Sequence, residues 1–63
     1  MLSEPERKVI FLALVETQDS GASVADSRQV IAQRFGLTEQ EVRHIEREGL
    51  NNEWPPLSEP TPT

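Results

Sequence analysis

Cysteine is absent from this chain of 63 residues, and histidine occurs only once. Without thiolates the protein can form no disulfide, and a single imidazole leaves no ordinary set of zinc ligands. We therefore expect no metal site and no other cofactor. The absence of cysteine also suits a reducing cytoplasm, where we expect the protein to be located, with the nucleoid as its site if it binds DNA.

Long hydrophobic runs are missing as well. The longest one, Val9 to Val15, spans seven residues, whereas a membrane-spanning helix needs about 20. Met1 is soon followed by acidic residues rather than by the basic stretch that opens a secretory signal. These features predict that the protein has no membrane partner.

Basic side chains are in the minority, with 6 Lys and Arg against 11 Asp and Glu and a net charge of -5. Nucleic-acid-binding proteins gain much of their affinity by neutralising phosphates, so this balance has the wrong sign for a generic binder. A local cluster can still act if the arginines gather on one side of the fold. The four arginines concerned are Arg28, Arg34, Arg43 and Arg47.

The first predicted helix covers about Leu2 to Thr17. The segment Ser3–Glu6 is typical of a capping box, and Pro5 is tolerated in a first turn. A β-strand competes for the apolar run Val9–Val15, but the capping box and the leucine and alanine content favour a helix. Seven consecutive apolar residues cover all sides of a helix. We therefore expect this helix to be buried on every side, covered partly by the tail or a partner.

The second predicted helix follows a loop. The segment Gln18–Ser23 has the residue types of turns. Either Ser23 or Ser27 can cap the helix that comes next. We expect that helix to end at Arg34 or Phe35.

The third predicted helix has the best-marked start in the chain. The segment Thr38–Glu41 is typical of a capping box, and Leu37 and Val42 have the spacing of a hydrophobic staple. We expect the helix to run from about Glu39 to Glu48. Gly49 then stands where a glycine commonly ends a helix.

The second and third helices together have the pattern of a helix-turn-helix. Ala32 is small enough to let the next helix cross closely, and Gly36 can adopt the positive φ of the turn without steric cost. Apolar residues at helical spacing face each other around these two positions. They are Ile31, Phe35, Leu37, Val42 and Ile45.

The stretch from Leu2 to Leu50 resembles region 4 of bacterial sigma factors. Leu2–Leu14 is similar to the helix that opens that region, and Val30–Leu50 is similar to its helix-turn-helix. Val42–Glu48 is close to the family's signature around the recognition helix. The resemblance implies a small all-α domain of three helices that reads the -35 promoter element and docks on the flap of RNA polymerase.

The chain also departs from that family at its predicted recognition helix. Arg43 matches the family pattern. Glu39 and Glu41 stand where the family usually has arginine, Gln40 replaces an acid, and His44 replaces a glutamine. A glutamate facing DNA is repelled by phosphates and is productive only where it accepts from a cytosine amine.

We predict a DNA-binding surface on the third helix, placed in the major groove. Gln40 can pair with adenine through two hydrogen bonds, and backbone N–H groups near Thr38 can hold a phosphate. The alternative is a solvated face with ion pairs such as Glu39–Arg43. The predicted DNA-binding residues are Thr38, Glu39, Gln40, Arg43, His44 and Arg47.

Catalysis is not expected. No motif places a nucleophile beside His44, and an exposed helical histidine is the ordinary case. Four glutamates could suggest a metal site, but we interpret them as capping and solvent-facing charges. They are Glu39, Glu41, Glu46 and Glu48.

The C-terminal tail, residues 51–63, holds four of the five prolines. We expect residues 2–50 to form the domain, 51–57 to pack on it, and 58–63 to be disordered. Trp54 is expected to fold back, since a small core gains much from one indole, although an extended Trp-Pro-Pro-Leu segment could instead dock on a partner. The candidate partner-binding residues are Phe11, Leu12, Val15, Trp54 and Leu57.

Two functions follow from these patterns. The first is a DNA-binding module of transcription regulation that resembles sigma region 4. The second is a protein-interaction module that keeps the fold but binds DNA weakly or not at all. Its partner would be RNA polymerase, a sigma-like protein or a second copy of the chain. A chain this short has a marginal core, which favours a homo-oligomer.

Overall fold

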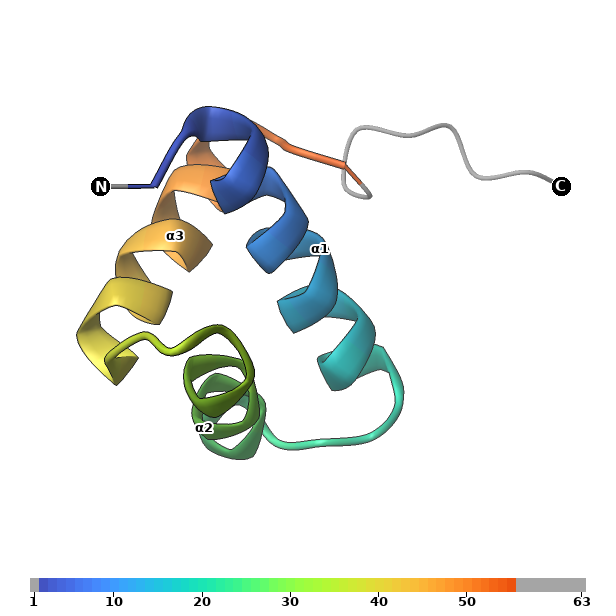
Figure 1. Ribbon diagram of the computed structural model, residues 1–63. Coiled ribbons are helices and arrows are strands. Elements are labelled where there is room, and N and C mark those ends of the chain that lie inside the picture. Colours follow the sequence, from blue (N-terminus) through green and yellow to red (C-terminus); the bar gives the residue numbers. More distant parts are fainter. Residues whose placement is uncertain (1, 56–63) are drawn as a thin grey trace, which may run out of the picture.

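The computed structural model describes residues 2–55, which form three α-helices packed on one another (Figure 1). Helix α1 covers Glu4–Asp19, α2 covers Val24–Phe35 and α3 covers Glu39–Asn51. No strand occurs in this part of the chain. The predicted all-α domain of three helices is confirmed, and the competing strand for the first apolar run is excluded.

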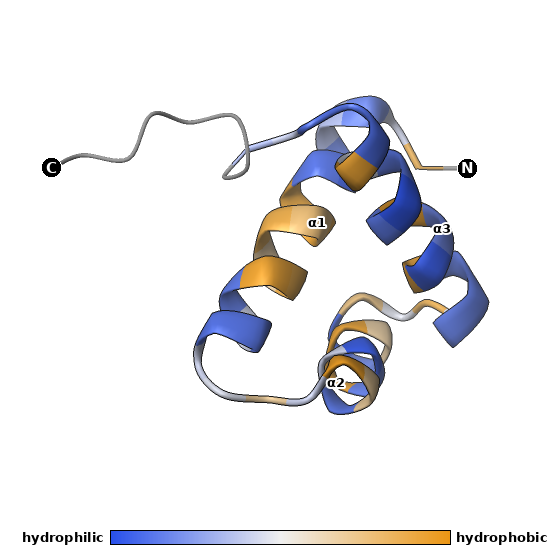
Figure 2. Cartoon of the chain, turned by 180° about the vertical axis from the view of Figure 1, so that it is seen from behind, coloured by the Kyte–Doolittle hydropathy of each residue, from blue (hydrophilic) through white to orange (hydrophobic). Residues whose placement is uncertain are grey.

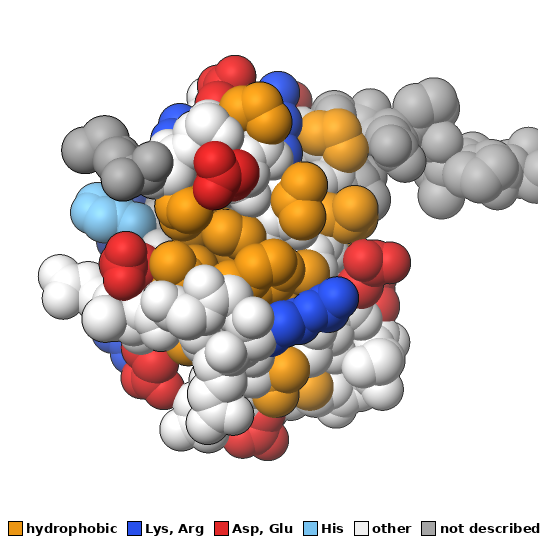
Figure 3. Space-filling model, in the orientation of Figure 1, with side chains coloured by type: hydrophobic (Ala, Val, Ile, Leu, Met, Phe, Trp, Pro, Cys, Tyr) orange, Lys and Arg blue, Asp and Glu red, His pale blue; other side chains and the backbone are white. Residues whose placement is uncertain are grey.

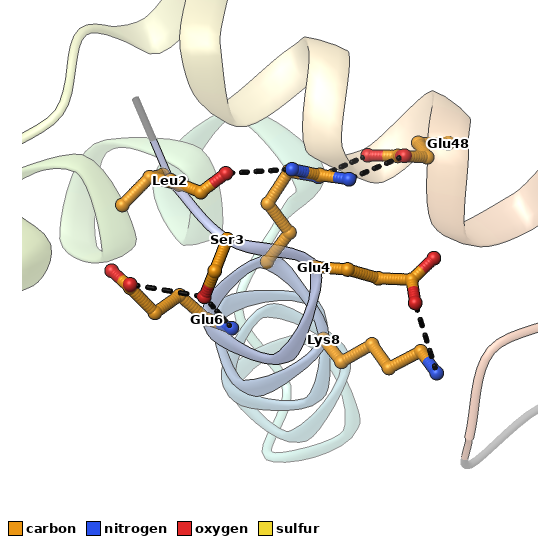
Figure 4. Close-up of polar contacts among 7 residues, drawn as sticks. Leu2, Ser3, Glu4, Glu6, Lys8 and Glu48 are labelled. Atoms are coloured by element: carbon orange, nitrogen blue, oxygen red, sulfur yellow. Dashed lines mark hydrogen bonds and ion pairs between the residues drawn. The ribbon is translucent and has the colours of Figure 1, made fainter.

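Helix α1 starts at the predicted cap and ends two residues later than expected. The Ser3 hydroxyl oxygen accepts a hydrogen bond of 3.3 Å from the Glu6 backbone N–H. The same hydroxyl donates to the Glu6 carboxylate at 3.0 Å, so this carboxylate bonds the cap's side chain (Figure 4). Helix α1 therefore has a Ser3 N-cap but not a full capping box. In a full capping box, the Glu6 carboxylate would accept from the backbone N–H of Ser3.

Among the described residues, the core covers only one side of α1. Ile10, Phe11 and Leu14 are buried in the core. Val9 and Leu12 remain 58% and 41% exposed, although the middle of the helix is hydrophobic all round (Figure 2). Within residues 2–55, α2 and α3 both pack on one side of α1, so the cover expected from the tail or a partner on its opposite side stays a prediction.

Helix α2 is capped by Ser23, the first of the two expected alternatives. Its hydroxyl oxygen accepts from the Asp26 backbone N–H at 3.1 Å. Ser27 lies inside the helix, fully buried, and donates to the Val24 carbonyl at 2.8 Å. It also accepts at 3.2 Å from the Gln18 amide at the end of α1, so this buried hydroxyl joins two helices.

The connection from α2 to α3 has the predicted turn. Gly36 adopts a left-handed conformation with φ 68°, which glycine reaches without steric cost. The Leu37 backbone N–H then bonds the Ala32 carbonyl at 2.8 Å. This bond lies at the end of α2, and α3 begins three residues after it. Ile31 and Val42 are buried where the two helices meet.

Helix α3 begins with a complete capping box, as predicted. Its end differs from the prediction, because Gly49 lies inside the helix, which continues to Asn51. Gly49 is buried against α1, and a Cβ built on it would overlap the Phe11 ring. A glycine here therefore permits close helix packing, and the expected role as a helix terminator is wrong.

Trp54 closes the core after α3. It is only 5% exposed, and its ring meets Phe11 edge-on with a centroid distance of 6.2 Å and an interplanar angle of 81°. Its backbone N–H donates to the Gly49 carbonyl at 3.0 Å. The reversal that brings it back uses a positive φ of 51° at Glu53. Leu57 and the predicted tail 58–63 lie outside the described residues.

The close approach of α1 and α3 predicts that Gly49→Ala destabilises the protein. Alanine favours a helix interior over glycine by about 1 kcal/mol, but the added methyl would displace Phe11 and overpack the core. We expect a net loss of about 1–3 kcal/mol in the free energy of unfolding, measured by urea denaturation followed by Trp54 fluorescence.

Leu50→Ala is the matched control for that substitution. Leu50 is the next residue of the same helix, and it is 56% exposed. We expect its unfolding free energy to stay within about 0.5 kcal/mol of the wild type. If Gly49→Ala were as stable as this control, the close contact with Phe11 would be refuted.

Candidate functional site

One side of α3 presents four exposed polar residues, which we call the outer face of α3. They follow a spacing of three, four and seven residues, and so lie in one stripe. Together they line a single open hollow on the surface. Val42 and Ile45, on the opposite side of the helix, are buried in the core. The outer face consists of Gln40, Arg43, His44 and Arg47.

The two arginines of the outer face carry free charges. Neither Arg43 nor Arg47 forms an ion pair with any residue in the range 2–55. The expected pair Glu39–Arg43 is not formed, although both side chains are exposed. The outer face therefore offers to solvent two guanidinium groups that no residue of 2–55 compensates.

A third arginine joins these two at the neighbouring hollow. Arg28 of α2 lines it together with Arg43 and Arg47. Arg34 is positioned elsewhere, with its guanidinium 5.5 Å from the centroid of the Phe35 ring. The sequence left open whether the four arginines gather on one side of the fold. Three of them border one surface hollow.

The two glutamates later in α3 are engaged in ion pairs with other helices, although Glu46 also lines the hollow with Arg28, Arg43 and Arg47. Glu46 accepts from the Arg28 guanidinium at 2.7 Å and from the Gln18 amide at 3.4 Å, and its side chain is 17% exposed. Glu48 accepts twice from Arg7, at 2.7 and 3.1 Å, as Figure 4 shows. Both acids were expected to face solvent. They are instead partly buried in ion pairs that join α3 to α2 and α1.

The start of α3 is already occupied by the protein's own carboxylate. The Glu41 side chain accepts from the Thr38 backbone N–H at 3.0 Å, and the Thr38 hydroxyl accepts from the Glu41 N–H at 3.1 Å. The Thr38 groups expected to hold a phosphate are therefore committed to the cap. Glu39 is exposed beside them and adds a second negative charge at this end.

His44 borders two hollows. It lines the outer-face hollow with Arg43, and a second one with Leu2 and Ile45 on the α1 side. Within residues 2–55, no group of three or more acidic or histidine side chains is placed to hold a metal ion. No helix in the same range is long and apolar enough to cross a membrane.

The candidate partner-binding residues separate into two groups. Phe11 and Trp54 are buried against each other, so they build the core and offer no surface to a partner. Leu12 is exposed and Val15 is half-buried. Val9, three residues before Leu12 and more exposed, is absent from the predicted set; a core on one side of α1 is the signal that identifies it.

Comparison with known proteins identifies no relative of this chain: no family model matches it, and neither a curated protein nor a solved structure matches it. Function is therefore inferred from what the described side chains can do. The outer face of α3 combines free positive charge with side chains able to hydrogen bond, on a helix that is anchored on its other side.

The capping box at the start of this face predicts the effect of Thr38→Ala. Loss of the hydroxyl leaves the Glu41 N–H without its partner, and we expect the free energy of unfolding to fall by about 1 kcal/mol. Thr38→Ser keeps the hydroxyl and is the matched control. Thermal denaturation followed by circular dichroism measures both, and equal midpoints for the two variants would contradict the role of the cap.

Proposed function

We propose that this protein is a DNA-binding module of transcription regulation that places α3 in the major groove. One observation carries the proposal. On the outer face of α3, Arg43 and Arg47 form no ion pair with residues 2–55, while Glu46 and Glu48 of the same helix are neutralised by Arg28 and Arg7. An acidic chain thereby acquires a locally basic surface on a helix.

The path of the chain also supports the proposed DNA-binding function. A three-residue turn with glycine, joining two helices, is typical of a helix-turn-helix, in which the second helix reads the groove. Helix α3 has 13 residues, equal to about 20 Å of length at 1.5 Å per residue. An α-helix with its side chains is about 10–12 Å in diameter, which fits the major groove of about 12 Å width.

Each residue of the outer face has a role in this proposal. Recognition helices contact base edges mainly through their N-terminal residues. We therefore assign base contacts to Gln40, which suits adenine, and Arg43, which suits guanine. Arg47 and His44 contact the phosphate backbone. Glu39 is left to accept from a cytosine amine, the one base contact that favours a carboxylate.

The net charge of -5 limits the affinity of a single domain. Arg28 is paired with Glu46, so Arg43 and Arg47 are left to neutralise few phosphates, and the Glu41 carboxylate opposes an anion at the start of α3. A lone domain of this size also reads few base pairs. We infer that useful specificity needs a second domain on the same DNA, as the resemblance to sigma region 4 also suggests with RNA polymerase as the partner.

Binding to DNA is tested by fluorescence anisotropy on a pool of random-sequence duplexes. We expect binding at low salt and a logarithm of affinity that falls linearly with the logarithm of salt concentration. Arg47→Ala should weaken binding to all sequences and reduce that slope by about 1. Arg43→Ala should in addition change which sequences the pool yields after selection.

Arg34→Ala is the charge-matched control, because Arg34 lies against Phe35 and outside the outer face of α3. We expect it to leave the affinity and the selected sequences nearly unchanged. Absence of binding at low salt, or equal losses in the Arg34 and Arg47 variants, would rule out the proposed surface.

A protein-interaction module with weak DNA binding is the second candidate. Exposed hydrophobic side chains favour it, and Figure 3 shows that such side chains stay uncovered across the middle of one face. One hollow of this kind is lined by Leu2, Val9, Ile10 and Phe35 together with Glu6. RNA polymerase or a sigma-like protein would dock there, and the function would then tolerate loss of both Arg43 and Arg47.

A further inference from the structure

The side of α1 that faces away from α2 and α3 has a pattern of its own, which we call the outward face of α1. At 100° per residue, Leu12 lies at its centre, diametrically opposite the buried side chains of the helix. Two hydrophobic and three charged side chains remain exposed along it, with a proline at one end. The outward face consists of Pro5, Lys8, Val9, Leu12, Glu16 and Asp19.

The charges of this face are weakly held within the chain. The Lys8 ammonium is 4.0 Å from the Glu4 carboxylate (Figure 4) and 5.8 Å from the centroid of the Trp54 ring, and its side chain is 46% exposed. Glu16 and Asp19 form no ion pair with any residue from 2 to 55. The face thus has an available cation before Leu12 and available anions after it.

We propose that a second copy of this chain packs antiparallel on the outward face of α1, with the two-fold axis beside Leu12. Lys8 and Glu16 each stand four residues from Leu12. In the antiparallel dimer, Lys8 of each copy therefore lies level with Glu16 of the other copy. Val9 and Val15 each stand three residues from Leu12, so they also come level, although Val15 is half-buried at the border of this face. The face is self-complementary in both charge and hydrophobicity.

Only the antiparallel arrangement has this property. A parallel pair in register would place Lys8 beside Lys8 and Glu16 beside Glu16, and like charges at such positions repel. Two-fold packing also uses the same patch on both copies and closes the assembly at a dimer. The segment that carries Trp54 lies beside Phe11 and Lys8 and leaves Val9 and Leu12 exposed. None of the residues 2–55 therefore covers the centre of the face, where the second copy is proposed to pack.

The size of the face sets the strength of the dimer. Helix α1 has 16 residues, and one such helix pair buries less than the roughly 800 Å² per partner of a standard stable interface. The dimer is therefore weak and forms at high protein concentration. It leaves the outer face of α3 open, because α1 and α3 form different sides of the domain (Figure 1).

Sedimentation equilibrium of the full chain, from about 10 μM to about 1 mM, measures this association without DNA. We expect the apparent mass to rise with concentration from 7.1 kDa toward twice that value. Leu12→Gln should raise the dimer dissociation constant about tenfold or more, since it places an amide at the centre of the interface. Val30→Gln alters an equally exposed valine of α2 and should leave the constant unchanged.

Charge reversal tests the register. Lys8→Glu and Glu16→Lys should each weaken the dimer, because both copies then place like charges level with each other. The double variant restores two opposite pairs and should recover the wild-type constant. Circular dichroism of each variant confirms that the helices are retained.

A chain that stays monomeric throughout the concentration range would overturn the proposal, and its outward face would then be open to the tail or to another protein. A dimer that Leu12→Gln leaves intact, or that the double reversal does not restore, would overturn it as well. The result is independent of DNA binding. Loss of affinity in the Arg47 variant with an unchanged dimer constant, or the reverse, separates the two proposals.

Discussion

The contact between Phe11 and Gly49 is the constraint on which the rest of this small domain depends. Because Gly49 has no side chain, the Phe11 ring of α1 lies directly against the backbone of α3, and Trp54 then meets the same ring edge-on. With the core side of α3 held in this way, Val42 and Ile45 face inward. The opposite side of the helix, with its two free arginines, must then face solvent.

The ion pairs distribute the charges of α3 between its two sides. The acids that lie toward the core side are paired with Arg7 of α1 and Arg28 of α2, both partly buried. Partly buried bonds of this kind fix orientation, because a carboxylate left there without its partner would cost desolvation energy. The arginines on the outer side have no such partner among the described residues. A helix with more acids than bases can therefore present a basic surface.

The two proposals place two different interaction surfaces on one small acidic chain. The outer face of α3 is polar and locally basic, which suits phosphates and base edges. The outward face of α1 is apolar at its centre, with opposite charges at equal distances from Leu12, which suits a second copy. Under the proposed DNA-binding function, pairing through α1 would bring together two copies of the outer face of α3, and so offset the weak affinity and short reading length of a single domain.

Local rules were sufficient to predict the three helices, the cap at Thr38 and the left-handed turn at Gly36, because each depends on neighbours within about four residues. The same rules placed Arg43, His44 and Arg47 on one side of α3. Only the tertiary structure decided that Gly49 is a packing position, that Glu46 and Glu48 are paired, and that Val9 and Leu12 stay exposed. Each of these depends on which segment, distant in sequence, lies against the residue. The hydrophobic periodicity of one helix does not predict such long-range contacts.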